Sequence, residues 1–262
     1  MSHVRLSTPA LGQRGGTMAL LVAACLVVMA SPALADDYDA AVAHRGRIPE
    51  DLRRDIYDHP AEILRFAGIG PGMQVADVLG ASGYYSELLS YLVGPTGKVL
   101  LINNGAYDHW STQLSQRLAD GRLPNVVHIT ANLNHMKLPD ASLDAVLLVK
   151  VFHDLYWRGE DWPFVSPPEV IEQLAKALKP GGALLLIDHS AKAGTGDDDV
   201  QKLHRIDEAF AIKQFTRRGF SVEATNHLLE VPTDTRDQPS LSSGMMGKTD
   251  RFVVLLRKRA QN

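Results

Sequence analysis

Three histidines and three aspartates follow the apolar segments in the second half of the chain. They are His153, Asp154, Asp188, His189, His204 and Asp207. Histidine is the commonest general base in enzymes, and a neighbouring carboxylate often orients its ring. We therefore expect one of the histidines to act as a base, with Asp154 or Asp207 as its partner. The candidate catalytic residues are His153, Asp154, His189 and His204.

The same residue types also bind metals, because imidazole and carboxylate groups suit zinc or iron. A set drawn from His153, Asp188, His189 and His204 is one such alternative. No pair of these histidines has the tight His-x-x-x-His spacing of a metal site, and Cys25 is the only cysteine. We therefore expect no metal in this protein.

A second stretch with chemical potential is the small-residue turn within residues 75–89. Its residues run Val-Ala-Asp-Val-Leu-Gly-Ala-Ser-Gly-Tyr, with Asp77 near the end of an apolar segment. Small side chains let a backbone approach a ligand closely, and the start of a helix presents free N–H groups. Asp77 can bind a cationic or hydroxyl group. We expect a ligand crevice here.

Alternating apolar segments and helices must position both stretches. We predict strands at residues 73–78, 98–102, 126–130, 144–149, 183–187, 220–229 and 251–257. We predict helices at residues 82–92, 108–118, 168–178 and 203–217, the last carrying His204 and Asp207 one turn apart. Continuous apolar strands separated by helices indicate a parallel sheet covered on both faces. Groups after the carboxyl ends of such strands face the ligand crevice.

The first 35 residues differ from the rest. Arg5 and Arg14 precede an apolar run at residues 18–30, which ends in Ala33-Leu34-Ala35. This order is typical of a secretory signal peptide. We expect cleavage after Ala35 and a periplasmic or secreted domain at residues 36–262, without stable membrane insertion. A lipoprotein attached at Cys25 and an uncleaved anchor are the alternatives. Residues 36–70 are expected to form a helical lid over the crevice.

The composition excludes one class of partner. The chain has 262 residues, 45% of them hydrophobic, and a formal net charge of −3. A protein that binds nucleic acid usually carries a basic stripe, and none appears. We therefore expect a small-molecule ligand; the oligomeric state is not predicted.

Later landmarks follow in a specific order: a Leu-Pro-Asp-x-Ser-Leu-Asp run at residues 138–144 and Leu-Lys-Pro-Gly-Gly at residues 178–182. With the turn after Asp77, they resemble the class I S-adenosylmethionine-dependent methyltransferases over residues 63–257. Residues 83–89, 151–154, 187–190 and 203–207 are similar to an exported bacterial group of predicted methyltransferases. The resemblance implies an α/β, Rossmann-like, seven-stranded and mostly parallel sheet with helices on both faces. It also implies S-adenosylmethionine as cofactor, bound by Asp77, Gly80, Ser82, Gly83, Tyr84, Asn103, Asn132 and Lys150.

The chain departs from this family at four positions. Leu79 and Ala81 stand where glycines are usual, and Asn103 and Asn132 stand where acids meet the ribose and the adenine. An amide accepts hydrogen bonds without a charge, and charge-assisted hydrogen bonds are roughly twice as strong. Cofactor binding is therefore expected to be weaker or altered, and Asn103→Asp to tighten it.

Two functions follow from these observations. The first is methyl transfer from S-adenosylmethionine to a small acceptor. The alternative is a non-catalytic, ligand-binding protein of the periplasm with a methyltransferase fold. A nicotinamide enzyme is disfavoured, since no Gly-x-Gly-x-x-Gly follows a strand.

Overall fold

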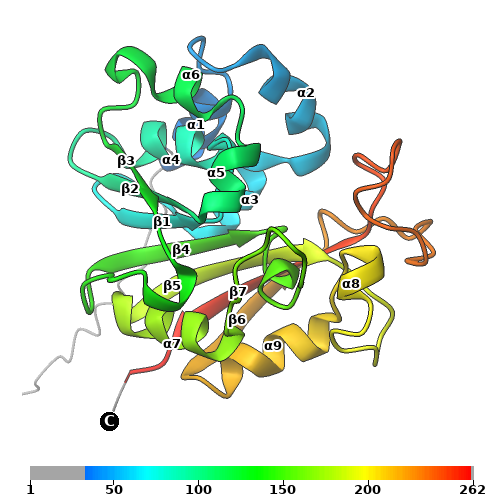
Figure 1. Cartoon of the computed structure of the whole chain (residues 1–262). Helices are drawn as coiled ribbons and strands as arrows, with labels where there is room; N and C mark the ends of the chain where they lie inside the picture. Colours follow the sequence, from blue (N-terminus) through cyan, green and yellow to red (C-terminus); the bar gives the residue numbers. More distant parts are fainter. Residues whose placement is uncertain (1–32, 261–262) are drawn as a thin grey trace, which may run out of the picture. The chain divides into compact units, whose positions relative to one another are not determined.

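The apolar strands form one seven-stranded sheet at the centre of the protein (Figure 1). The computed structural model describes residues 33–260. The strands are β1 (Gln74–Val78), β2 (Lys98–Asn103), β3 (Val126–Thr130), β4 (Leu143–Val149), β5 (Leu178–His189), β6 (Phe220–Asn226) and β7 (Arg251–Lys258). Their order is β3-β2-β1-β4-β5-β7-β6. The first five strands are parallel, and β7 inserts antiparallel between β5 and β6. This confirms the predicted Rossmann-like fold.

Helices cover both faces of the sheet (Figure 1). They are α1 (Ala33–Val42), α2 (Pro49–Asp58), α3 (Pro60–Ala67), α4 (Tyr84–Val93), α5 (Gly105–Trp110), α6 (Leu114–Leu118), α7 (Pro167–Ala177), α8 (Val200–Leu203) and α9 (Glu208–Thr216). Short 3₁₀ turns lie at η1 (Ala119–Gly121), η2 (Leu133–His135) and η3 (His153–Leu155). One core packs α1, α3 and α4 against the sheet, and the other packs α7 and α9. Burial on both faces explains why β1, β4, β5 and β7 are apolar without alternation.

The predicted helix at residues 203–217 is confirmed over 208–216 as α9 and is wrong at its start, because the chain leaves the helical conformation between α8 and α9. His204 ends α8 with φ 49° and ψ 51°, and Asp207 begins α9, where its side chain accepts from the backbone N–H of Phe210. Between them, Ile206 forms a bridge with Ser190 beside the end of β5. Asp207 therefore caps a helix and does not partner His204. The predicted helix at 108–118 is likewise two short helices, α5 and α6, separated at Ser111.

The predicted lid divides into two parts. Side chains of α1 and α3 belong to a hydrophobic core, whereas α2 lines a cavity described below. Residues 1–32 of the predicted signal peptide, including Cys25, lie outside the described residues, so cleavage and export stay predictions. Within residues 33–260, no helix combines the length and the hydropathy that a membrane span requires.

Candidate functional site

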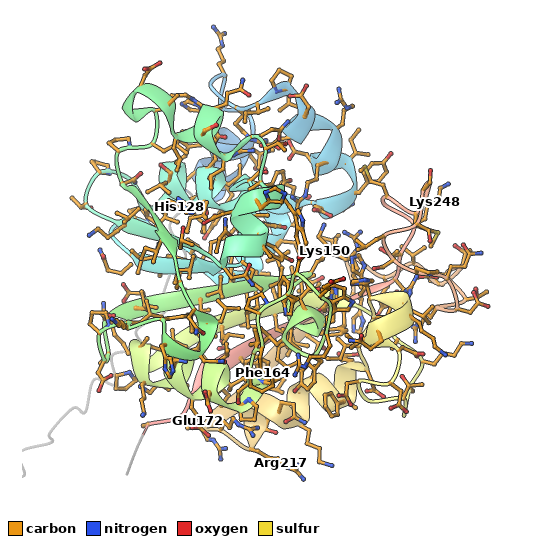
Figure 2. All side chains as sticks on the ribbon, in the orientation of Figure 1. His128, Lys150, Phe164, Glu172, Arg217 and Lys248 are labelled. Atoms are coloured by element: carbon orange, nitrogen blue, oxygen red, sulfur yellow. The ribbon has the colours of Figure 1, made fainter. Side chains whose placement is uncertain are left out.

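A cavity of about 760 Å³ opens at the carboxyl edge of the sheet, between α2 and residues 240–247. The turn between β1 and α4 forms its floor, and Lys150 and His189 reach it from the ends of β4 and β5. A smaller cavity of about 200 Å³ lies against Asp77 and Tyr107. The two cavities share five lining residues, which are Arg54, Gly80, Ala81, Tyr84 and Lys150. Lys150 is labelled in Figure 2. A combined space of this kind suits a small-molecule ligand.

The turn after β1 follows a left-handed path. Leu79 has φ 55°, Ala81 has φ 53° and Gly83 has φ 82°. A left-handed conformation costs a residue with a side chain about 1–2 kcal/mol. Leu79 and Ala81 therefore hold a strained conformation that glycine would adopt without this cost. Gly80 is required for a different reason, since a Cβ atom there would lie 2.6 Å from Oδ2 of Asp77.

Asp77 is buried beneath this turn. Its Oδ2 accepts a hydrogen bond of 2.7 Å from the Ser86 hydroxyl. Burial raises the pKa of Asp77 to about 6, and the Ser86 bond and the nearby Arg54 offset this only in part. A carboxylate with so little compensation gains free energy from a cationic or hydroxyl group of a ligand. The predicted role of Asp77 in ligand binding fits this environment.

Three cations share one carboxylate at the wall of the large cavity. Asp58 pairs with Arg54 at 2.6 Å, with Lys150 at 2.8 Å and with Arg251. Burial disfavours the charge on Asp58, but these cations hold its pKa well below its usual range. Burial, and next the charge of Arg54, lower the pKa of Lys150 to about 8. The excess of positive charge suits an anionic group on a ligand.

Sequence reasoning missed two members of this cluster, Asp58 and Arg251. Asp58 and Arg251 are far apart in the chain, and neither belongs to a motif, so no local pattern indicates their contact. It also missed Arg117, which is fully buried and pairs with Asp51 of α2 at 2.7 Å. The Nε of Arg117 donates to the carbonyl oxygen of Ser82. Arg117 therefore joins α2 to the turn after β1.

The predicted catalytic histidines separate into two environments. His189 lines the large cavity, and its Nδ1 is buried without a hydrogen-bond partner among the described residues. Burial, and then the charge of His153, hold the pKa of His189 well below its usual value, so its ring is neutral. His153, Asp154 and His204 line neither cavity.

His153 is held between two carboxylates. Its Nδ1 lies 2.7 Å from Oδ1 of Asp188, and its Nε2 lies 3.3 Å from Oδ1 of Asp154. Burial opposes a charge on this ring, but Asp188 and Asp154 outweigh it and raise the pKa of His153 to about 9. A ring that is already protonated at neutral pH is a poor base, so His189 is the better candidate.

The two asparagines predicted to bind the cofactor make hydrogen bonds within the protein. Asn103 is buried, accepts from the N–H of Ala81 at 3.0 Å and donates to Oδ1 of Asp108 at 2.8 Å. Asn132 is exposed and accepts from the N–H of Asn134 at 2.9 Å. Neither residue lines the two cavities. Their roles in cofactor binding stay predictions, and an acid at position 103 would face Asp108.

The remaining cofactor candidates lie together. Gly80, Ser82 and Tyr84 line the large cavity with Lys150, whereas Gly83 supports the turn from behind. A Cβ atom at Gly83 would lie 2.9 Å from Leu101. Gly83 therefore helps to shape the turn, and its predicted contact with the cofactor stays a prediction.

Comparisons with known proteins show sequence similarity to methyltransferases. Residues 79–186 match a family model described as "Methyltransferase domain". A ubiquinone/menaquinone biosynthesis C-methyltransferase from Shewanella oneidensis is 28% identical over 162 residues, which cover 59% of this chain and 60% of that protein. Its counterpart from Shewanella sediminis is 27% identical over 222 residues, covering 80% and 81%. The chain thus spans less than two thirds of the length of the first of these relatives.

Solved structures show the same fold. A SAM-dependent methyltransferase from Aquifex aeolicus has a TM-score of 0.57 and 23% identity, covering 80% of this chain and 94% of that one. The [4+2]-cyclase SpnF has a TM-score of 0.56 and 13% identity, covering 80% and 82%.

The sheet order, with an antiparallel β7 beside β5, defines a Rossmann-like methyltransferase fold. Together with the domain match at residues 79–186, it supports the class I S-adenosylmethionine-dependent methyltransferase family. S-adenosylmethionine is the cofactor that these findings support.

Proposed function

We propose that this protein transfers a methyl group from S-adenosylmethionine to a small acceptor. The observation that carries the proposal is the pair of cavities that share the turn after β1 and Lys150. One space lies against the buried acid Asp77, and the other lies against a neutral histidine and a cluster of cations. Cofactor and acceptor would then meet beside Lys150.

The residues present fit the cofactor. The backbone at Gly80 leaves no room for a Cβ atom, so the turn packs closely over Asp77. Asp77 would hold an amino or hydroxyl group of S-adenosylmethionine, and Arg54 or Lys150 would hold its carboxylate. Arg54 also lies 3.9 Å from the centre of the Tyr84 ring, which fixes its position by a cation–π contact.

The protein itself would position the acceptor and remove a proton from it. When bound, S-adenosylmethionine supplies an electrophilic methyl group. Lys150 and Arg251 would orient an acceptor that carries a negative or polar group. His189 lines this cavity with a neutral ring, so it would take the proton that the acceptor loses.

The alternative is a ligand-binding protein without turnover, resident in the periplasm. The internal hydrogen bonds of Asn103 support it, because the position that usually meets the ribose is occupied by the turn itself. The finer assignment to an exported bacterial group rests on residues 83–89, 151–154, 187–190 and 203–207 and implies export, as the predicted leader at residues 1–35 does for a periplasmic or secreted location. N-terminal sequencing of protein from cell fractions tests both; a cytoplasmic chain that begins at Met1 would contradict export.

Calorimetric titration with S-adenosylmethionine and S-adenosylhomocysteine tests the cofactor. We expect the wild type to bind both and Asp77→Asn to bind about tenfold more weakly, since a charge-assisted hydrogen bond is lost. Asp144→Asn is the matched control. This acid lies at the opposite end of the sheet, where it accepts from the N–H of Gln74. No binding at millimolar ligand would overturn the proposal.

A second experiment separates methyl transfer from binding alone. Release of S-adenosylhomocysteine is followed with panels of anionic and neutral small acceptors. His189→Ala should leave the affinity for S-adenosylmethionine unchanged and reduce turnover at least tenfold, because the acceptor keeps its proton. Tight cofactor binding with no turnover on any acceptor would favour the alternative.

A further inference from the structure

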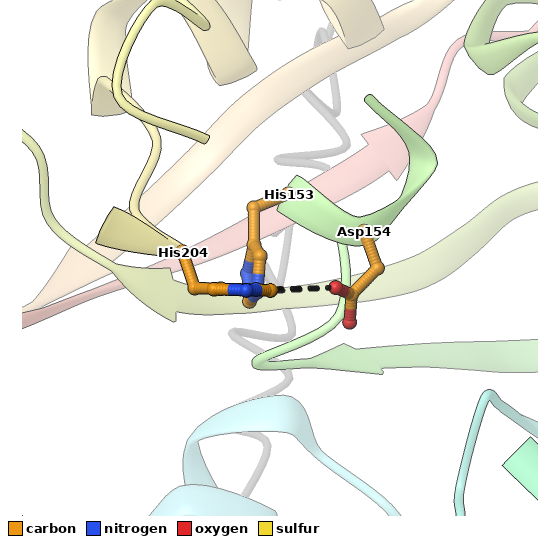
Figure 3. A group of neighbouring side chains, drawn as sticks. All are labelled: His153, Asp154 and His204. Carbon is orange, nitrogen blue, oxygen red and sulfur yellow. Dashed lines mark ion pairs between the residues drawn. The ribbon is translucent and has the colours of Figure 1, made fainter. Parts of the chain in front are cut away.

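Three side chains that line neither cavity converge beyond the end of β4. His153 and Asp154 belong to η3, and His204 ends α8 (Figure 3). Nε2 of His153 lies 3.3 Å, and Nδ1 of His204 lies 3.8 Å, from the same Oδ1 of Asp154. One possible ligand atom from each residue lies within 4.8 Å of the other two.

Two further residues orient this group. Asp188 is fully buried and accepts from both the backbone N–H and Nδ1 of His153, at 2.8 and 2.7 Å. The Nδ1 proton is therefore fixed, and Nε2 points toward Asp154. The Tyr107 hydroxyl donates to Oδ2 of Asp154 at 2.7 Å, which leaves Oδ1 for the two imidazoles.

His204 is held in a strained conformation. Its φ of 49° lies in the left-handed region, which a residue with a side chain rarely adopts. The Ser240 hydroxyl donates to its carbonyl oxygen at 2.9 Å, and its own N–H donates to the Val200 carbonyl at 3.1 Å. Its Nδ1 is nevertheless buried with no hydrogen-bond partner among the described residues. Strained backbone and orphaned polar atoms gather at functional sites.

We propose that His153, Asp154 and His204 bind a divalent transition-metal ion, with zinc or iron(II) as the class. Two imidazoles and one carboxylate are ligands that these metals take, and three protein ligands leave a position open. Donors about 2.1 Å from a tetrahedral metal are separated by about 3.4 Å. The separations of 3.3 and 3.8 Å therefore need only a small adjustment.

The surroundings of the group match those of known metal sites. A ligating histidine almost always donates its other N–H to a carboxylate, as His153 does to Asp188. The two buried carboxylates, Asp154 and Asp188, would be neutralised by one divalent ion. The ligand set differs from the one considered from the sequence, since Asp188 orients His153 and His189 faces the cavity instead. The proposal also departs from the expectation of no metal made from the sequence.

Direct metal binding tests this proposal without reference to methyl transfer. Protein freed of metal by dialysis against a chelator is titrated with Zn²⁺ by calorimetry and with Co²⁺ by absorption. We expect one equivalent of each ion, and visible d–d bands of a four- or five-coordinate Co²⁺ site. His204→Asn keeps a residue that tolerates the left-handed backbone. It should lose at least tenfold in Zn²⁺ affinity and change the Co²⁺ spectrum.

Two more variants complete the set. Asp188→Asn leaves all three ligands in place and should weaken binding by about 10–100-fold. His227→Ala removes the histidine of an exposed pair, His227–Glu230, and should change nothing. Circular dichroism and calorimetric binding of S-adenosylhomocysteine report whether each variant is folded.

Wild-type protein alone provides a second measurement. In NMR spectra, the imidazole resonances of His153 and His204 should shift on addition of one equivalent of Zn²⁺, and those of His227 should not. Absence of stoichiometric binding, or equal affinity in all variants, would overturn the proposal. The cluster would then be held together only by its hydrogen bonds and ion pairs.

Discussion

The turn after β1 and the histidine cluster after β4 lie at the same edge of the sheet but are built in opposite ways. The turn draws its parts from one short stretch, from Asp77 to Ser86, and the backbone gives it its shape. The cluster draws His153, Asp188 and His204 from three segments, and side-chain contacts give it its shape. The turn therefore depends on steric fit within one short stretch, whereas the histidine cluster forms only when the distant segments have packed together.

The two regions also treat buried acids differently. Burial raises the pKa of Asp77 to about 6, and the Ser86 hydrogen bond and the nearby Arg54 offset this only in part. Burial also disfavours the charge on Asp154, but the charge of His153, the neighbouring His204 and the hydrogen bond from Tyr107 lower its pKa. The charge of Asp77 is therefore poorly compensated within the protein and would be stabilised by a ligand, whereas the charge of Asp154 is already compensated by neighbouring side chains. Four substitutions test this contrast, from the largest expected effect to the smallest.

Gly80→Ala should damage the turn most. Its Cβ atom would lie 2.6 Å from Oδ2 and 2.7 Å from Cγ of Asp77. Overpacking of this kind costs about 1–3 kcal/mol, and displacement of Asp77 should also abolish detectable cofactor binding. Urea denaturation and calorimetry measure the two effects. Gly70→Ala is the control, because nothing lies within 4 Å of a Cβ atom there. Equal behaviour of the two variants would contradict the steric argument.

Asp188→Asn should destabilise the cluster and spare the turn. It removes the charged acceptor of His153, which is worth about 2 kcal/mol for a hydrogen bond to a charged group. The pKa of His153 is raised to about 9 in the folded protein, above its ordinary 6.5. Its stabilising contribution is therefore complete below pH 6.5 and is lost as the pH rises through 9. Denaturation of metal-free protein at pH 6 and pH 9.5 should show a smaller difference from wild type at the higher pH. A difference independent of pH would contradict the assignment.

Asp77→Asn should stabilise the protein while weakening cofactor binding. The folded pKa of about 6 lies above the ordinary 3.8, so the folded state holds this proton more tightly. The free energy of unfolding of the wild type therefore falls as the pH rises from about 4 to 6. The asparagine variant has no ionisable group at this position, so its free energy of unfolding does not fall for this reason. We expect the variant to be more stable by about 1–2 kcal/mol at pH 7.5 and by little at pH 4.5. A variant less stable at pH 7.5 would show that Asp77 already has a sufficient internal partner.

Ala81→Gly should give the smallest effect. It removes the cost of a left-handed φ of 53°, offset by the greater freedom of glycine in the unfolded chain. The net gain should be about 0.5–1 kcal/mol in thermal or urea denaturation. Ala141→Gly is matched, since Ala141 has φ 48° and is exposed away from the cavities. It should give a similar gain. A loss at position 81 alone would show that the alanine methyl group supports the turn.

Much of the sheet and of the turn after β1 could be predicted from the sequence. Apolar runs and their spacing predicted all seven strands, since continuous hydrophobic segments between helices have few other ways to be buried. Asp77 and the small residues after it predicted a ligand turn, because their effect is local. The helix predicted at 203–217 failed at His204, where packing of Ile206 beside β5 overrides helical propensity.

What the sequence alone determined is therefore the sheet, its likeness to methyltransferases and the turn over Asp77. Only the tertiary structure separated His189, which faces the cavity, from His153 and His204, which face Asp154. It also brought Arg251 to Asp58 and gave Asn103 its contacts with Ala81 and Asp108. Hydrophobic periodicity acts through neighbours in the chain and can be read from a sequence. Partners of buried charges come from distant segments, and only the completed packing decides which of them meet.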